Sequence, residues 1–467
     1  MTTTTARQNS SDRRAARGTP SSSGSRRFSA TDIIVVIAIN ALLVVAMWVR
    51  HGGLTQLESS SAKLTAAGQI TALVGTYFAL VQVVLMARSP WLERRFGLDG
   101  LAQWHRWLGF TVTILISAHV VFSTIGYALG DGSSIAQEAW TLITTYPYVL
   151  MATVATGLLI MVAVTSIRMA RARLSYETWR FVHLYAYLAI ALAFGHELAV
   201  GSDFTEDFVA RWYWIALYAA VGLCLLTFRI GEPLRRSLHH QLKVARVVPE
   251  AQDVVSVYIT GHHLGELQAR AGQYFRWRFL TRDNWWRTNP FSLSAPVNSQ
   301  FLRITVKGIG DASRELQHLR PGTRVGIEGP YGLFTTGRLT RSKVLLIAGG
   351  IGITPLRALI EEIPPKKDAI TLLYRARRWE DIVFRSELEQ LIRDRRGVIH
   401  YLIGRRGTPE LASDPISAQT VRRLVPDVIS RDVFICGPHG MMKRTEEVLR
   451  TIGVPDQQIH LERFALL

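Results

Sequence analysis

The chain has 467 residues, 48% of them hydrophobic and 19% charged, with a net charge of +18 and two cysteines. This balance argues against a wholly soluble protein, and two distant cysteines exclude a disulfide framework, a zinc knuckle or an iron–sulfur cluster. Much of the positive charge lies in a tail and in loops between apolar blocks, where anionic lipid explains it, so we expect no nucleic-acid partner.

Residues 1–29 form a tail rich in serine, threonine, arginine and glycine. This composition offers little apolar surface to bury, so we predict a disordered tail. The apolar block that follows could be a cleaved signal peptide. No convincing small-residue cleavage site follows it, which favours a retained helix.

Six apolar blocks occupy the chain up to about Ile230. Each approaches the roughly 20 residues that a helix needs to cross a bilayer. Lipid offers no partner for open backbone groups, so we predict six spanning helices. We place them at Ile33–Val49, Ala67–Ala87, Trp104–Tyr127, Tyr146–Ile167, Phe181–Val200 and Trp212–Phe228.

The connections between these blocks differ in charge. The tail and the second and fourth loops are rich in arginine, whereas the fifth loop contains the acidic stretch "GSDFTED". Positive residues stay on the cytoplasmic side of a membrane. We therefore expect a multi-pass protein of the cell membrane, in contact with membrane lipid, with both termini in the cytoplasm.

Four of the thirteen histidines lie in predicted spans. "HRWLGFTVTILISAH" runs from His105 to His119 in the third helix, and "HLYAYLAIALAFGH" runs from His183 to His196 in the fifth. Both helices cross in the same direction, so the rings form two pairs at depths roughly 20 Å apart. Neutral imidazole is a good axial ligand for haem iron. The pattern favours two bis-histidine b-type haems over interfacial or core histidines, and over a dinuclear metal centre.

The two stretches differ in helical phase. Fourteen residues bring His105 and His119 nearly to one helix face, whereas thirteen leave His183 and His196 well apart around the axis. We therefore predict an irregular or ending helix around Gly195–His196, where the glycine would ease the distortion.

This arrangement resembles the ferric reductase and NADPH oxidase superfamily, whose members have six helices with paired haem-ligating histidines on the third and fifth. The spacings of thirteen and twelve intervening residues match those of the NADPH oxidases. The resemblance covers nearly the whole chain after the tail. It implies that His105 and His183 bind an inner haem and that His119 and His196 bind an outer haem.

Short strand-like runs separated by turn signals follow Pro233 and indicate an antiparallel barrel. They are "LKVARVV", "VVSVYIT", "QYFRWRF", "FLRITVK" and "TRVGIEG". We expect "GPYG", Gly329–Gly332, to be a turn that ends the barrel.

Two segments of this region suit a flavin nucleotide. "NPFSLSA", Asn289–Ala295, places an aromatic ring beside a hydroxyl that could reach a flavin ring nitrogen, although an ordinary strand with a buried Phe has the same pattern. "VKGIGDASREL", Val306–Leu316, leads through a glycine turn to a helix start at Ser313. Such a start binds phosphate through free backbone N–H groups, or is simply a capped helix after a turn.

"KVLLIAGGIGITPLRALI", Lys343–Ile360, is typical of a strand, a glycine-rich turn and a helix. Its glycines would let the backbone close on a pyrophosphate, although their spacing differs from the usual dinucleotide fingerprint. "TLLYRAR" and "VFICGP" indicate further parallel strands, and the last strand ends in "HLERFALL".

As a set, these motifs resemble the ferredoxin–NADP reductase module. The resemblance implies FAD binding by Pro290, Phe291, Ser292, Leu293, Lys307, Gly310 and Ser313, with Arg287 replacing the charge that the family has at the position of Asn289. It implies nicotinamide nucleotide binding by Gly349, Gly350, Gly352, Thr354, Pro355, Cys436, Gly437 and Pro438. Phe464 takes the place of the aromatic that shields the flavin. The candidate catalytic residues are Ser292, Cys436 and Phe464.

Three arginines bear on the choice of nucleotide. Arg375, Arg377 and Arg378 follow the second strand of this domain, where the extra phosphate of NADPH would lie. Arginine pairs well with phosphate, which favours NADPH over NADH, although a basic solvated loop is the alternative.

We therefore predict a multi-domain membrane protein. Its expected parts are a tail (1–29), a six-helix transmembrane haem domain (30–232), an antiparallel β-barrel FAD domain (237–338) and an α/β nucleotide-binding domain (340–467). The expected enzyme is an NAD(P)H-dependent flavocytochrome oxidoreductase that passes electrons from NADPH through FAD and two b-type haems to an outer acceptor.

The acceptor stays open at this point. The histidine spacing favours oxygen, reduced to superoxide. A ferric chelate, or a separate periplasmic or membrane partner enzyme that the chain supplies with electrons, are the alternatives. A transporter with a regulatory flavoprotein domain would leave the four matched histidines unexplained.

Overall fold

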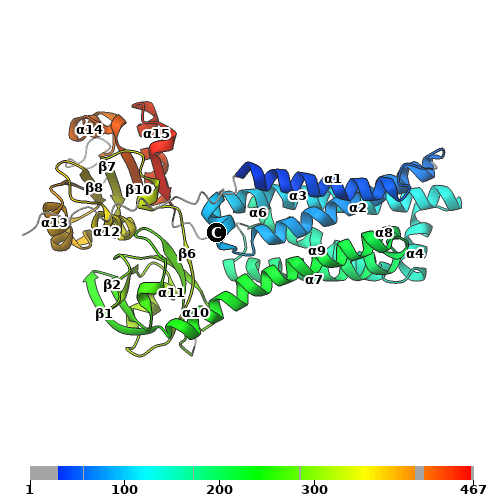
Figure 1. Ribbon diagram of the computed structural model, residues 1–467, viewed down its shortest axis with the longest axis horizontal. Helices are drawn as coiled ribbons and strands as arrows, with labels where there is room; N and C mark the ends of the chain where they lie inside the picture. Colours follow the sequence, from blue (N-terminus) through cyan, green and yellow to red (C-terminus); the bar gives the residue numbers. More distant parts are fainter. Residues whose placement is uncertain (1–29, 56, 172, 283–284, 405–414, 464–467) are drawn as a thin grey trace, which may run out of the picture.

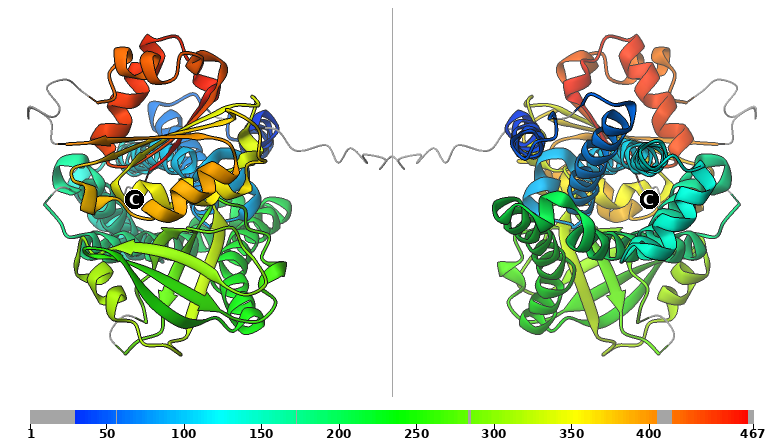
Figure 2. Two further views of the ribbon diagram at one scale, coloured as in Figure 1. Left: turned by 90° about the vertical axis from the view of Figure 1, so that its left-hand side faces the viewer. Right: turned by 90° about the vertical axis from the view of Figure 1, so that its right-hand side faces the viewer.

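The computed structural model describes residues 30–55, 57–171, 173–282, 285–404 and 415–463, and the predicted disordered tail lies outside them. The molecule is elongated (Figure 1), with helices at one end and two domains that contain β-strands at the other. The end-on views show these two domains one beside the other across the end of the helices (Figure 2). We call these two domains together the soluble module.

The helical end consists of α1 (Ala30–Arg50), α2 (Ser60–Leu85), α3 (Pro90–Asp131), α4 (Ile135–Thr145), α5 (Val149–Ser166), α6 (Arg168–Arg171), α7 (Tyr176–Val200), α8 (Ser202–Thr205) and α9 (Phe208–Leu226). Within the described residues, six helices are long and apolar enough to cross a membrane. They are Thr31–Arg50, Ser60–Leu85, Gly100–Asp131, Val149–Ser166, Glu177–Val200 and Phe208–His240. The prediction of six spanning helices is confirmed.

Local sequence explains where several of these helices begin and bend. The hydroxyls of Ser59, Ser134 and Ser175 accept backbone N–H groups at the starts of α2, α4 and α7. The carboxylate of Asp207 does the same for α9. Such caps satisfy N–H groups that have no partner within a helix. In α3, Gly97 has a φ of +68° and separates a short first segment from the span.

The sixth span continues directly into the soluble module. A π-helical turn, η1 (Thr227–Gly231), joins α9 to α10 (Glu232–His240), which packs against the barrel strand β6 (Val325–Tyr331). The rod formed by α9, η1 and α10 thus links the two ends of the molecule (Figure 1).

The barrel is antiparallel, as predicted. Its strands are β1 (Lys243–Ala251), β2 (Val254–Thr260), β3 (Tyr274–Phe279), β4 (Asn289–Ser292), β5 (Leu302–Lys307) and β6. They form sheets of order β1-β2-β5 and β4-β3-β6, and the bridges Lys243–Arg324 and Leu293–Ile304 join the sheets on both sides. A short helix, α11 (Asp311–Glu315), follows β5.

The expectation that "GPYG" is a turn needs a correction. Gly329, Pro330 and Tyr331 belong to β6, where Tyr331 pairs with Tyr274 of β3. The chain leaves the sheet only at Gly332, whose φ of +95° suits glycine. Glu328 and Tyr331 pair with β3 on either side of a register shift, so Gly329 and Pro330 form an irregularity within the strand.

The last domain is a parallel sheet covered by helices, and this too was predicted. Its strands are β7 (Val344–Gly349), β8 (Ile370–Ala376), β9 (Val398–Ile403), β10 (Asp432–Cys436) and β11 (Ile459–Glu462), in the order β11-β10-β7-β8-β9. Its helices are α12 (Ile353–Glu362), α13 (Arg385–Asp394), α14 (Ala418–Leu424) and α15 (His439–Thr451). All strand pairs are parallel, and β7, β8 and β10 are almost fully buried, as such sheets require.

An ion-pair network joins the barrel to this domain. Glu387 of α13 accepts hydrogen bonds from Arg303 of β5 at 3.1 and 3.2 Å, and it also pairs with Arg357 of α12. Both arginines are only 6% exposed. A buried charge that loses its partner is strongly destabilising, so the shared carboxylate couples the two domains.

A substitution at this carboxylate tests the coupling. Glu387→Gln keeps the shape of the side chain but leaves the buried Arg303 without its anion and Arg357 with only Glu361. Because Glu387 is partly exposed, we expect a loss of about 2–3 kcal/mol, below the ~3–5 kcal/mol of a fully buried pair, and a fall of about 5–10 °C in the midpoint of thermal FAD release.

The matched control is Glu389→Gln, which removes an exposed pair with Arg385 on the same helix. An exposed ion pair contributes about 1 kcal/mol or less to the free energy of unfolding. The midpoint of thermal FAD release of Glu389→Gln should therefore stay near that of the parent protein. Equal shifts in the two variants would contradict the proposed coupling.

Candidate functional site

The four histidines lie where the third and fifth spans face each other. His105 and His119 are on α3, and His183 and His196 are on α7. The ring centroids of His105 and His183 are 5.9 Å apart. Two metal–imidazole bonds of about 2 Å each, together with the ring radii, place two axial rings about 6 Å apart, so one iron fits between these rings.

Hydrogen bonds fix three of the four rings through the same nitrogen. The Nδ1 atom of His119 lies 2.9 Å from the Gly68 carbonyl, and that of His105 lies 3.3 Å from the Gln82 carbonyl. The Nδ1 atom of His183 lies 3.4 Å from the Ser166 hydroxyl. Ligating histidines usually engage their second nitrogen in this way, which leaves Nε2 for the metal.

Close packing of α2 against α3 makes the Gly68 contact possible. A Cβ at Gly68 would collide with the Ser123 hydroxyl, and one at Gly126 would lie 2.9 Å from the Thr65 backbone nitrogen. Small residues let membrane helices approach in this way. In contrast, the buried Nδ1 of His196 has no hydrogen-bond partner among the described residues, which is a costly position for a polar atom unless a ligand engages the ring.

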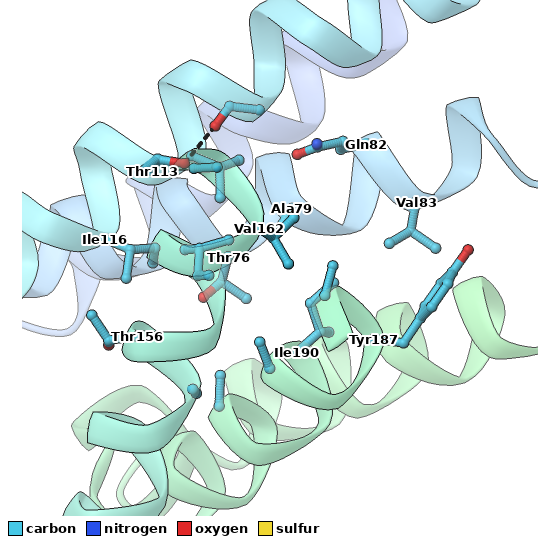
Figure 3. A pocket seen from close by; sticks show the side chains of 18 of the residues that line it. Thr76, Ala79, Gln82, Val83, Thr113, Ile116, Thr156, Val162, Tyr187 and Ile190 are labelled. Atoms are coloured by element: carbon cyan, nitrogen blue, oxygen red, sulfur yellow. Dashed lines mark hydrogen bonds between the residues drawn. The ribbon is translucent and has the colours of Figure 1, made fainter. Parts of the chain in front are cut away.

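A single cavity of about 2300 Å³ runs past all four histidines. At one end it is lined by Arg276 of the barrel strand β3, and at the other by Thr205 and Glu206 beyond α7. Figure 3 shows its middle part, where side chains such as Ile116, Val162 and Ile190 surround the space. Because ordinary ligand pockets measure about 300–1,000 Å³, this cavity has room for more than one large ligand.

The charges around the cavity are unevenly distributed. Arginines from several elements line its end at the soluble module: Arg88, Arg106, Arg171, Arg180, Arg229 and Arg276. The carboxylates of a haem are anionic and pair well with such side chains. The axial rings, the space and the charges together fit two b-type haems.

The predicted irregularity at Gly195–His196 is wrong. α7 runs without interruption from Tyr176 to Val200 and includes both residues. The cavity instead extends around the helix, because Ala186, Ala189 and Ala193 line it between His183 and His196. These small side chains leave the space that a bend was expected to provide.

The flavin segment also contains a polar atom without a partner. Ser292 ends β4 and is 4% exposed, and its hydroxyl has no hydrogen-bond partner among the described residues. The Trp277 indole donates to the Phe291 carbonyl at 2.9 Å and holds β4 in place, while Pro290 is exposed and Leu293 is buried. An unpaired hydroxyl beside an aromatic ring fits the polar edge of a flavin.

Arg287 lies in the loop before β4. Its guanidinium stacks over the Trp286 ring at 4.8 Å, and its Nε is buried without a partner among the described residues. The expected pyrophosphate contact of this side chain stays a prediction.

In the second flavin segment, Val306–Leu316, Ser313 stabilises the local backbone. Its hydroxyl accepts the backbone N–H groups of Ile309 and Gly310, both at 3.0 Å, and so closes the turn before α11. Lys307 ends β5 and is exposed. The Ser313 hydroxyl therefore caps the turn before a helix, which is the second of the two interpretations offered for this segment. Phosphate binding by the segment stays a prediction.

The glycine-rich turn lies at the switch point of the parallel sheet. The chain runs from β7 outward to β8 and β9, and then returns to β10 on the other side of β7. The ends of β7 and β10 therefore bring Gly349–Gly352 beside Cys436–Pro438, the position where open α/β sheets bind ligands. Gly352 must be glycine, because a Cβ there would collide with the Cys436 carbonyl.

The other residues of this segment support the turn. The Thr354 hydroxyl donates to the Ile351 carbonyl at 3.0 Å, and Pro355 is buried in the first turn of α12. The Cys436 side chain is fully buried in the hydrophobic core, and burial raises the pKa of its thiol well above its usual value.

The predicted arginine cluster is divided in the structure. Arg375 donates to the Leu402 carbonyl at 2.9 Å and to the Gly404 carbonyl, and so fixes the ends of β8 and β9. Arg378 pairs with Asp381 at 3.4 Å. Arg377 is exposed and makes no hydrogen bond or ion pair to the described residues. Phe464, the predicted flavin shield, lies outside the described residues.

Sequence reasoning missed two groups beside the histidines. One is Glu197, whose carboxylate accepts hydrogen bonds from Thr76 at 2.6 Å and Tyr218 at 3.0 Å. A lone carboxylate inside a span is usually functional, and this signal could have found it. The other is the backbone of α2 at Gly68 and Gln82, which no side-chain pattern reveals.

Contacts with the soluble module were also missed. Arg88, between α2 and α3, forms an ion pair with Glu328 of β6, and Arg278 of β3 lies 3.3 Å from the same carboxylate. Burial lowers the pKa of Arg88 to about 9 and raises that of the neighbouring Glu93 to about 8. These contacts hold the barrel against the cavity end.

Comparisons with known proteins agree with this architecture. Residues 71–194 match the family of the ferric reductase like transmembrane component, and residues 346–447 match the oxidoreductase NAD-binding domain. Together the two matches correspond to the fused architecture of the ferric reductase and NADPH oxidase superfamily. The soluble module of the chain contains an oxidoreductase NAD-binding domain, and its helical domain has the helices of a multi-pass membrane protein.

Individual relatives match the chain over part of its length. The ferredoxin reductase component of 3-ketosteroid-9-alpha-monooxygenase from Mycobacterium tuberculosis is 32% identical over 49% of this chain, which spans 66% of that relative, just under two thirds. Ferredoxin–NADP reductase B from Sorangium cellulosum is 31% identical over 37% of this chain and 75% of its own length. The FAD/NAD binding domain of nitric oxide dioxygenase from Vibrio cholerae is 24% identical, covering 48% of this chain and 98% of that domain, with a TM-score of 0.40.

Substitution of either histidine in the His105–His183 pair tests the site. We expect His105→Ala, and separately His183→Ala, to lower the haem content of the purified chain from two per chain to one, because haem iron needs both axial rings. Pyridine haemochrome analysis measures this content.

His400→Ala, in the soluble sheet strand β9, is the matched control and should keep two haems. Bound FAD reports whether the variants fold. Retention of both haems in His105→Ala and His183→Ala would contradict the assigned pair.

Proposed function

We propose that this enzyme passes electrons from cytoplasmic NADPH, by way of FAD and two b-type haems, to oxygen on the outer side of the membrane, and so forms superoxide. In overall balance, one NADPH and two oxygen molecules yield NADP⁺, one proton and two superoxide ions. The N-terminus and the soluble module would both face the cytoplasm.

The observation that carries the proposal is the continuity of the cavity. One space reaches from Arg276 of the flavin barrel, past both histidine pairs, to Thr205 and Glu206 beyond the last turn of α7. Arg88 and Glu328 hold the barrel at the entrance. A chain built in this way can keep carriers in sequence across the lipid without moving either domain.

The bound groups would supply the electron chemistry: flavin links the two-electron chemistry of a nicotinamide to the one-electron chemistry of haem. The residues of the chain bind and orient these groups. His105 with His183, and His119 with His196, would hold the irons, while Ser292 and Phe291 would position the flavin ring. The switch-point glycines would hold the nucleotide, and Arg377 is the arginine of its cluster that is left to meet the extra phosphate of NADPH.

The proposed orientation rests on charge. The arginines that line the cavity lie at the end where the soluble module is attached, and Arg88 of the second loop contacts that module directly. Excess positive charge marks the cytoplasmic side of a membrane protein. The opposite end is marked by the acidic pair Glu206 and Asp207.

Oxygen is favoured as the acceptor by two features. The histidine spacing resembles that of the NADPH oxidases, and the cavity is lined largely by apolar side chains, which admit a small apolar molecule. Ferric-chelate reduction and electron supply to a separate partner protein are the alternatives that the experiment must distinguish.

Acceptor assays on the purified enzyme test this proposal. NADPH-driven reduction of cytochrome c should fall by more than about tenfold when superoxide dismutase is added, if superoxide carries the electrons. The same preparation under argon should reduce ferric chelates far more slowly than it consumes oxygen in air.

Two outcomes would contradict oxygen as the acceptor. Reduction that resists dismutase and continues under argon with a ferric chelate would indicate a ferric reductase. Haems that NADPH reduces but that pass electrons neither to oxygen nor to ferric iron would indicate a missing protein partner.

A further inference from the structure

Two pairs of adjacent histidines meet where the last membrane helix enters the barrel. His239 and His240 end α10, and His262 and His263 follow β2, at the start of the 3₁₀ turn η2 (Leu264–Glu266). More than twenty residues separate the two segments along the chain. Their meeting is therefore a product of the fold and not of local sequence.

Backbone contacts hold the two segments together. The His262 N–H donates to the His240 carbonyl at 2.7 Å, and the Nδ1 of His240 lies 3.1 Å from the His262 carbonyl. Gly261 permits this approach, because a Cβ there would collide with the His240 carbonyl. His240 is only 5% exposed and therefore serves as the buried support of the junction.

Three exposed side chains converge above this support. The Nε2 of His239 lies 2.8 Å from one oxygen of Glu266, and the Nδ1 of His263 lies 3.1 Å from the other. The rings of His239 and His263 are stacked, with centroids 4.7 Å apart and planes 13° apart. The three ligand atoms all lie within 4.8 Å of one another.

We propose that His239, His263 and Glu266 bind a divalent transition-metal ion of the zinc class. Metal bonds of about 2 Å in tetrahedral geometry separate ligand atoms by about 3.3 Å, so small rotations of these exposed side chains suffice. Two imidazoles and one carboxylate are a ligand set typical of zinc sites that keep a fourth position open to water. Imidazole nitrogen also disfavours calcium and magnesium, which prefer oxygen ligands.

The backbone of His263 gives an independent indication. Its φ of +53° places it in the left-handed region, which is uncommon for a residue other than glycine. Strained backbone of this kind often accompanies a binding site.

The bound ion would fasten α10 to the barrel. His239 belongs to the rod that begins as the sixth span, whereas His263 and Glu266 belong to the loop between β2 and β3. An ion held by both would restrain the angle between the membrane helix and the flavin domain. Because the site is exposed, the ion would exchange with the surrounding solution.

Zinc binding to the full-length purified protein, with its affinity tag removed, tests the proposal. In titrations against a chromophoric chelator, we expect the parent to bind one Zn²⁺ more than His239→Ala/His263→Ala. Glu266→Gln, which keeps the side-chain shape, should weaken that extra site by more than about tenfold, since even indirect partners of metal ligands cost that much. Co²⁺ should give tetrahedral absorption bands in the parent only.

His318→Ala is the matched control, because it removes an exposed histidine from the same barrel and should leave the extra site intact. Bound FAD shows whether each variant folds. Equal zinc binding by the parent and the double variant would overturn the proposal and leave only an ion-pair cluster. The readout is metal binding, so it is independent of the electron acceptor.

Discussion

A membrane interior offers no water to a polar side chain, and this constraint governs the arrangement of the helical domain. Each imidazole placed there must find a protein partner or a ligand. Two backbone carbonyls of α2, those of Gly68 and Gln82, lie within hydrogen-bond distance of the imidazoles of His119 and His105. The close approach of α2 to α3 that this requires depends on small residues. All four histidines line one cavity. The packing of three helices is thus explained by the four rings that they surround.

The soluble module obeys a different constraint, which is set by sheet topology. Strand order places the ends of β7 and β10 side by side, and glycine is required there because the two backbones nearly touch. Glu387 then couples this domain to the barrel through the buried Arg303, while Arg88 and Glu328 couple the barrel to the membrane domain. The three parts are therefore joined by charged contacts as well as by the rod of α9, η1 and α10.

Much of this arrangement could be predicted from the sequence, since its signals are strongly periodic or chemically rare. Long apolar blocks predicted the spans, and histidines within them predicted the cavity-lining pairs. Tertiary contacts explain the failures. Pairing of Glu328 and Tyr331 with β3 keeps "GPYG" within the strand up to Tyr331, where composition predicts a turn. Alanines along α7 widen the cavity, so that helix needs no bend at His196. Arg375 looks free in the sequence, yet β9 carbonyls engage it. A backbone hydrogen-bond partner such as the Gly68 carbonyl, which His119 contacts, cannot be predicted from a pattern of side chains.

The central claim is that electrons cross the membrane through the cavity. Proteoliposomes with the soluble module outward and ferricyanide trapped inside test it most directly, because neither NADPH nor ferricyanide crosses lipid. The account predicts that external NADPH reduces the trapped ferricyanide, and that His119→Ala abolishes this reduction while leaving FAD bound. Ferricyanide reduced only on the NADPH side, with the trapped pool unchanged, would contradict it.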